Sequence, residues 1–190
     1  MMKWEIYLDV DGVCADFIGP ALTAVGLDSA LIQQQWAEQY PGNFYPDELL
    51  GMSAAELFRR IDALGAGFCA TLPACNWFPS LYHELSTLGH VVFLTAPTGY
   101  PDCLAGKYQW LCRFFGEGFR DCVFTEHKER LAHPDAILID DSDNNIRNFI
   151  QRGGYGVSFP QYWNQRGSSA DPLQDVLEDV RQIVGAAHQN

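Results

Sequence analysis

Five short apolar runs, separated by segments of helical length, constrain the fold of this 190-residue chain more than any other feature. Each run is compatible with a buried strand, and the runs cover residues 4–10, 90–95, 122–125, 136–140 and 156–159. Between the runs, apolar residues recur at helical spacing and then meet a glycine, as at Gly89, Gly116 and Gly153. Alternation of this kind predicts an α/β fold, a doubly wound parallel sheet of about five strands.

The gap between the first two predicted strands is far longer than one crossover helix requires. We therefore expect residues 14–80 to form an inserted helical lobe, whereas residues 1–13 and 81–190 form the core. Inside the gap, Ser53 and Glu56 have the spacing of a capping box, which predicts the start of a helix that Gly65 ends.

The charge of the chain restricts its partners. With 24 acidic and 12 basic side chains, the formal net charge is −12 at pH 7, which repels a phosphate backbone. No stretch approaches the roughly 20 apolar residues of a membrane span, and the first apolar run is too short for a signal peptide. Six cysteines contain no C-x-x-C pair, so we expect reduced thiols, with Cys69 and Cys75 as a disulfide or metal alternative. These features predict a cytoplasmic protein that binds neither a nucleic-acid polymer nor a membrane, and they leave a homodimer open.

Reactive side chains follow four of the predicted strands at their carboxyl ends. They are Asp9 and Asp11, Thr95, Lys128, and Asp140 and Asp141. Because open α/β sheets bind ligands at this edge, we expect these groups to converge there. Four carboxylates without a cation would repel one another, which indicates a divalent metal, and oxygen ligands without paired His or Cys favour Mg²⁺ over zinc.

The same residue types supply what phosphoryl transfer requires. A metal and a lysine neutralise the phosphate, an aspartate attacks phosphorus to form an aspartyl-phosphate, and an acid protonates the leaving oxygen. Other motifs explain less of the sequence. An EF-hand loop begun at Asp9 needs a carboxylate where Pro20 stands, and a glycosyltransferase D-x-D leaves Thr95 and Lys128 unexplained. A receiver domain uses similar residues with its acidic pair first.

In this order the motifs resemble those of the haloacid-dehalogenase superfamily of Mg²⁺-dependent phosphatases. Residues 9–17, 107–116 and 124–141 are more specifically similar to the 5'(3')-deoxyribonucleotidase family, and the similarity spans most of residues 4–160. The resemblance implies a Rossmann-like core with a small helical cap inserted after the first strand. It also implies a small phosphomonoester substrate.

The resemblance assigns roles to individual residues. It implies that Asp9 is the nucleophile, that Asp11 is the acid and base, and that Thr95 binds the phosphate. It further implies that Mg²⁺ is held by Asp9, the main-chain carbonyl of Asp11 and Asp141, with Asp140 in close support.

Two lysines compete for the phosphate. Lys128 has the usual superfamily position after the third strand, whereas Lys107 matches a family lysine on the helix after the second; the alternative for Lys107 is a solvated helix face. Two other positions depart from the family. Ala96, beside the expected phosphate, replaces a serine, and Glu126 replaces a basic residue. A carboxylate there should weaken or redirect the binding of an anionic nucleotide, unless Glu126 faces solvent.

Aromatic residues offer a surface for a flat ligand. Phe17 matches a family aromatic that packs on the substrate, and a base could stack there against Phe44, Tyr45 or Phe68, although each also suits a core. We expect a hydrolase, a Mg²⁺-dependent phosphomonoesterase of the 5'-nucleotidase type that acts on nucleoside monophosphates. Two alternatives remain: a phosphatase of another small phosphomonoester such as a sugar phosphate, and an idle phosphate-binding protein. The base, the sugar and the 5' or 3' position are not predicted.

Overall fold

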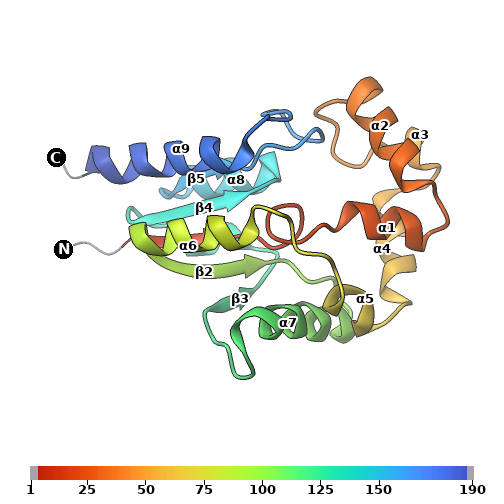
Figure 1. Cartoon of the computed structure of the whole chain (residues 1–190), viewed down its shortest axis with the longest axis horizontal. Coiled ribbons are helices and arrows are strands. Elements are labelled where there is room, and N and C mark those ends of the chain that lie inside the picture. The colour runs from red at the N-terminus through yellow and green to blue at the C-terminus, as the bar shows by residue number, and fades with distance from the viewer. Residues whose placement is uncertain (1–3, 188–190) are drawn as a thin grey trace.

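The computed structural model describes residues 4–187, and its centre is a parallel sheet of five strands (Figure 1). The strands are β1 (Trp4–Leu8), β2 (Gly89–Thr95), β3 (Cys122–Phe124), β4 (Ala136–Asp140) and β5 (Tyr155–Ser158). They lie in the order β3-β2-β1-β4-β5, and each neighbouring pair is parallel. The predicted α/β fold with about five parallel strands is confirmed.

Helices cover both faces of the sheet. They are α6 (Phe78–Leu88), α7 (Pro101–Phe115), α8 (Asp143–Gln151) and α9 (Pro172–Ala187), and the 3-10 helix η1 (Lys128–Leu131) precedes β4. Residues of α6 and α9 share a core with Ile6 and Leu8 of β1, whereas α8 packs on the opposite face, where the Phe149 ring meets Tyr7 edge-on. Because β1 is buried on both faces, it is a nearly continuous apolar run in the sequence.

The first strand is shorter than predicted because the chain turns sharply after it. β1 ends before Asp9 rather than at Val10, although the Asp9 N–H still donates to the Ile139 carbonyl oxygen at 3.0 Å. The Val10 carbonyl then accepts from the N–H groups of Cys14 and Ala15, at 2.8 and 2.7 Å. The residues that follow Asp9 therefore form a tight turn at the carboxyl edge of the sheet.

Five short helices lie between β1 and α6, which confirms the predicted helical insertion after the first strand. They are α1 (Ile18–Ala24), α2 (Ser29–Gln39), α3 (Asp47–Leu50), α4 (Ala54–Asp62) and α5 (Ala66–Ala70), and with their loops we call them the insert. Figure 1 shows α1 to α4 beyond the arrowheads of the strands. The capping box is confirmed, since the Ser53 side chain accepts the Glu56 N–H at 3.2 Å and α4 begins at Ala54.

The two ends of the insert are hydrogen-bonded to each other. The Asp16 N–H donates to the Pro73 carbonyl at 2.9 Å, and the Cys75 N–H donates to the Cys14 carbonyl at 2.8 Å. The insert therefore leaves and rejoins the core at one place, next to the turn that follows β1.

Two further expectations concern the cysteines and the membrane. All six cysteines are free, so the alternative of a disulfide between Cys69 and Cys75 is wrong. Over residues 4–187, no helix is long and apolar enough to cross a bilayer.

Candidate active site

A cavity of about 350 Å³ lies where the carboxyl ends of the strands meet the insert. The core contributes polar groups to its wall, and the insert contributes aromatic rings. The predicted residues that line it are Asp9, Asp11, Phe17, Phe44, Tyr45, Thr95, Ala96, Lys128 and Asp141. Most of the predicted site residues therefore come together around one space.

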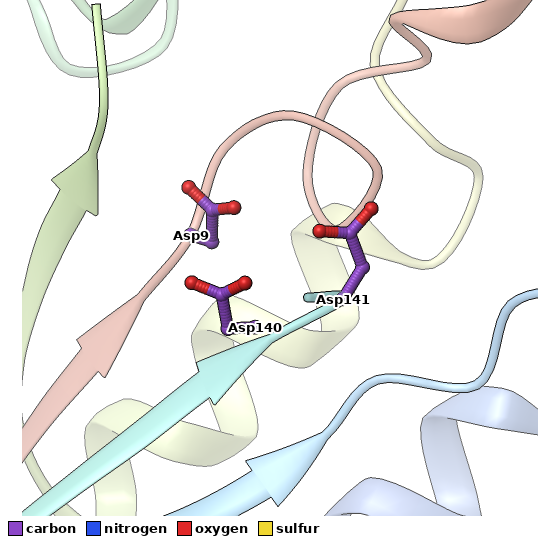
Figure 2. A group of neighbouring side chains, drawn as sticks. All are labelled: Asp9, Asp140 and Asp141. Carbon is purple, nitrogen blue, oxygen red and sulfur yellow. The ribbon is translucent and has the colours of Figure 1, made fainter. Parts of the chain in front are cut away.

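Three carboxylates form a buried cluster at the edge of this cavity. Figure 2 shows Asp9 just after β1, Asp140 at the tip of β4 and Asp141 one residue further, with their carboxylates gathered in one region. Each residue offers an oxygen within 4.8 Å of the others, and all three are at most 7% exposed. The parallel register of β1 and β4 brings these residues together, because Leu8 pairs with Ile139 immediately before the acidic residues of both strands.

Lys128 is the cation paired with this cluster. Its ammonium lies 2.8 Å from Asp9 Oδ1 and 2.6 Å from Asp140 Oδ2, and the residue is 2% exposed. Burial disfavours the charged ammonium, but the carboxylates of Asp140 and Asp9 outweigh it and raise the pKa of Lys128. The other Asp140 oxygen accepts the Ser142 N–H at 2.8 Å and an amide N–H of Asn145 at 3.1 Å, so Asp140 is held on both sides.

One ammonium does not balance three buried carboxylates. Burial, with repulsion from Asp140 and Asp11, raises the pKa of Asp9 to about 7, even though Lys128 opposes the shift. Burial, with repulsion from Asp140 and Asp9, also raises the pKa of Asp141 well above its usual range. A donor set of clustered carboxylate oxygens with an excess of negative charge fits a divalent cation. The cluster is therefore a candidate metal site.

Asp11 belongs to a second polar group, with Lys107 and Thr95. The Lys107 ammonium donates to Asp11 Oδ2 and, at 3.1 Å, to the Thr95 hydroxyl. Lys107 is 3% exposed, which contradicts the alternative of a solvated helix face. The other Asp11 oxygen, Oδ1, is buried and has no hydrogen-bond partner among the described residues. The two lysines therefore pair with different carboxylates: Lys107 with Asp11, and Lys128 with Asp9.

Gly12 leaves the space that Asp141 occupies. It has φ +73°, which L side chains rarely adopt, and a Cβ at this position would overlap Asp141 Oδ2. The same Cβ would lie 2.9 Å from Asp141 Cγ and 3.1 Å from Trp163 Cζ2. Asp141 is therefore confined between the turn after β1 and the indole of Trp163.

Of the predicted aromatic residues, Phe17, Phe44 and Tyr45 line the cavity. Phe68 is not among the residues that line it; its ring packs edge-on against Phe17, with centroids 5.9 Å apart. Phe58 lines the cavity instead and stacks on Phe17 at 5.7 Å. Trp36 also lines the wall, and the helical pattern of the insert did not mark either residue as more than core.

Two further positions differ from what the sequence suggested. Glu126 is exposed and is absent from the cavity lining, so the structure gives it a solvent-facing position. Trp163 lines the cavity but was missed, because it lies in a polar loop after β5 that has no apolar periodicity.

Comparisons with known proteins identify the family of the chain and solved structures with a similar fold. A model of the family described as "5' nucleotidase, deoxy (Pyrimidine), cytosolic type C protein" matches residues 3–189. A sequence search of curated proteins found no match. A haloacid dehalogenase-like family hydrolase from Xanthomonas campestris has a similar structure, with a TM-score of 0.62 and 12% identity, covering 99% of this chain and 94% of that one.

Two other solved structures have a similar fold. A HAD-superfamily hydrolase of subfamily IA from Geobacter sulfurreducens has a TM-score of 0.52 and 15% identity, covering 82% of this chain and 89% of that one. CbbY from Rhodobacter sphaeroides, solved in complex with phosphate, has a TM-score of 0.51 and 16% identity, covering 89% and 91%. At these identities the likeness shows the fold, whereas the family match extends over nearly the whole sequence. The chain belongs to the 5' nucleotidase, deoxy (pyrimidine), cytosolic type C family of hydrolases and has a haloacid-dehalogenase fold.

Proposed function

We propose that this protein is a Mg²⁺-dependent phosphomonoesterase that hydrolyses nucleoside monophosphates through an aspartyl-phosphate on Asp9. The observation that carries the proposal is the buried cluster of Asp9, Asp140 and Asp141 at the edge of a cavity walled by aromatic side chains. The charged end of this cavity suits a phosphate with its metal, and the aromatic walls suit a nucleoside.

Asp9, Asp141 and the main-chain carbonyl of Asp11 would hold Mg²⁺, with Asp140 in support, and the bound cation would neutralise charge on the phosphate. A carboxylate oxygen of Asp9 attacks phosphorus while the bond from phosphorus to the leaving nucleoside oxygen breaks. Lys128 and the Val10 N–H, both 2.8 Å from Asp9 Oδ1, fix the orientation of the attacking group.

Asp11 supplies the proton that the leaving oxygen takes up. Lys107 holds Oδ2 of this carboxyl group, so we assign the transferred proton to the unpartnered Oδ1. Water then attacks phosphorus of the aspartyl-phosphate and gives a proton back to Asp11, which releases inorganic phosphate and restores both aspartates. This assignment makes Lys107 a positioning residue for Asp11.

The phosphate would be bound by Thr95, the backbone at Ala96 and Lys128. We choose Lys128 over Lys107 as the phosphate ligand because Lys128 lines the cavity and Lys107 does not. Apart from Lys128, no Lys or Arg lines this cavity among the described residues. We infer that the phosphate, rather than a second anionic group, is the charged part of the substrate.

The nucleoside would lie against Phe17, Phe44 and Tyr45, with Phe58 completing the aromatic wall and Phe68 supporting Phe17 from behind. Tyr45 has φ +58°, a conformation rarely adopted by residues other than glycine and often retained at functional sites. The family description supports a deoxyribose sugar and a pyrimidine base as the preferred substrate.

We also propose a division of the chain into a core of residues 1–13 and 81–190 and a cap of residues 14–80. The hydrogen-bonded ends of the insert support this division, because they show that the insert leaves and rejoins the core at one place. The word "cytosolic" in the family description supports a cytoplasmic location. Twofold dimers are the commonest soluble assemblies, so a homodimer is part of the proposal, and light scattering tests it.

The experiment that tests the function is a substrate panel. Phosphate release is measured with and without Mg²⁺ on 5'- and 3'-monophosphates of ribo- and deoxyribonucleosides, on sugar phosphates and on an aryl phosphate. We expect nucleoside monophosphates, deoxypyrimidine 5'-monophosphates first, to have the highest kcat/KM. A preference for sugar phosphates would identify another phosphatase, and no hydrolysis of any substrate would identify an idle phosphate-binding protein.

Asp9→Asn tests the nucleophile. The change keeps the size of the side chain but removes the attacking charge, so turnover should fall at least roughly a thousandfold, or about 4 kcal/mol of barrier. Circular dichroism should show an intact fold. A variant with near wild-type turnover would exclude the aspartyl-phosphate.

A further inference from the structure

The loop that follows β5 holds Asp141 at two points. The Trp163 indole N–H donates to Asp141 Oδ2 at 2.8 Å, and the Asn164 side-chain amide donates to the Asp141 carbonyl at 2.9 Å. Both residues are buried, with exposures of 6% and 1%. The amide of Asn164 also donates to the Phe159 carbonyl at 2.7 Å, which ties the loop to its own start.

The Trp163 indole is itself fixed by its neighbours. Tyr162 meets it edge-on at a centroid distance of 4.6 Å, and Trp36 of α2 lies 6.2 Å away. Trp36 is anchored in turn, because its own indole N–H donates to the Asn43 carbonyl at 2.8 Å. The indole N–H that donates to Asp141 is therefore held in place by residues of both the core and the insert.

A hydrogen bond from a fixed donor limits the directions a carboxylate can take. The hydrogen bond to Asp141 is formed in a buried site, where water does not replace it. With Gly12 on the opposite side, Asp141 has little room to rotate. Metal affinity depends on ligands that are oriented before the cation arrives.

We propose that Trp163 is a positioning residue for the divalent cation site, and that its indole N–H orients the Asp141 carboxylate for metal binding. The proposal rests on the metal site of the proposed function. It predicts that the hydrogen bond, rather than the bulk of the ring, determines how tightly the cation is held. It also gives the insert an influence on the metal site, through the contact between Trp36 and Trp163.

Two substitutions separate the donor from the ring. Trp163→Phe keeps an aromatic ring and loses the N–H. Trp163→His loses half of the ring, but the imidazole Nε2–H can occupy the place of the indole Nε1–H because the five-membered rings superimpose. Trp110→Phe is the matched control, since the Trp110 N–H donates to the Leu72 carbonyl at 2.9 Å, the residue is 1% exposed, and it does not line the cavity.

The readout is the Mg²⁺ dissociation constant of each whole protein, measured by isothermal titration calorimetry without substrate. We expect Trp163→Phe to raise Kd about 10-fold, as the loss of such supporting hydrogen bonds does at other metal sites. Trp163→His should stay within about threefold of wild type, and Trp110→Phe within about twofold, whatever thermal stability either one loses.

The outcomes distinguish this inference from the function on which it rests. Wild-type protein that binds Mg²⁺, with Trp163→Phe binding equally well, overturns the role of Trp163 and leaves the metal site intact. A loss in Trp163→His as large as in Trp163→Phe also overturns it, because bulk would then account for the effect. Wild-type protein that binds no Mg²⁺ overturns the metal site and this inference together.

Discussion

Gly12→Ala is the substitution whose cost follows most directly from the structure. The added methyl group faces two separate penalties. Backbone with φ +73° costs an L-residue about 1–2 kcal/mol, which is partly offset by about 0.4–1 kcal/mol because alanine restricts the unfolded chain. The methyl group also overlaps the Asp141 carboxylate, and overpacking of a buried site costs about 1–3 kcal/mol more.

Gly51→Ala isolates the second penalty. Gly51 has φ +65°, close to that of Gly12, but apart from its two chain neighbours no heavy atom of residues 4–187 lies within 4 Å of the position its Cβ would take. The backbone cost is therefore shared by the two variants, and the contact with Asp141 occurs in one of them. The difference between their free energies of unfolding should be about 1–3 kcal/mol.

The two variants should differ even more in catalysis. Relief of the overlap displaces the Asp141 carboxylate, and a displacement of about 1 Å at a site of this kind can cost roughly 100-fold. Urea denaturation measures the free energy of unfolding, and an m-value equal to that of wild type shows that the change is one of stability. Phosphate release from a nucleoside monophosphate measures kcat/KM. Gly51→Ala should keep wild-type kcat/KM. Equal losses of stability in both variants, with kcat/KM unchanged in Gly12→Ala, would refute the argument that Gly12 makes room for Asp141.

Three other predictions follow from the site. Lys128→Met leaves Asp9 and Asp140 buried without their cation, so it should destabilise the metal-free protein by about 3–5 kcal/mol in urea denaturation. As a control, Arg181→Met breaks an exposed pair with Glu84 and should lower the free energy of unfolding by less than about 1 kcal/mol. Mg²⁺ at about 100 times its Kd should add about 2.7 kcal/mol of stability and raise Tm by roughly 5–10 °C in wild type but not in Asp141→Ala. If EDTA changes neither the Tm nor the activity, the protein binds no functional metal. Glu126→Arg should change kcat/KM on nucleoside monophosphates and on an aryl phosphate by the same small factor, since Glu126 is exposed, and a selective gain of about tenfold on nucleotides would contradict its placement.

The sequence predicts the sheet well because strands buried on both faces are short, continuous apolar runs with sharp ends. Each strand lies within two residues of its predicted range. We also expected the side chains at the carboxyl ends of the parallel strands to lie together at one edge of the sheet, and they do. Asp9, Thr95, Lys128 and Asp141 come from different parts of the chain and line one cavity.

Side-chain partners are less predictable, because they depend on how helices are rotated and how far side chains reach. Periodicity places Lys107 on a helix, but the contact that pairs it with Asp11 depends on the exact position of α7 against the turn after β1. Phe58 and Phe68 are both apolar residues of helices in the insert, and the packing of α4 and α5 decides which ring reaches the cavity. Trp163 lies 22 residues after Asp141, in an irregular loop beyond β5, so no repeating pattern in the sequence indicates the hydrogen bond between them.

The central position of β1 has a consequence for how the chain folds as it is synthesised. Glu5 of β1 pairs with His90 of β2 on one side and with Ala136 of β4 on the other. A ribosome that adds roughly 5–20 residues per second completes β4 about 7–26 s after β1, since about 130 residues separate the two partners. Until β4 is made, at least one edge of this apolar strand has no partner, which makes it a natural site for chaperone binding and for misassembly with other nascent chains. Helices α1 to α4 of the insert contact one another, so these contacts have time to form before the sheet does.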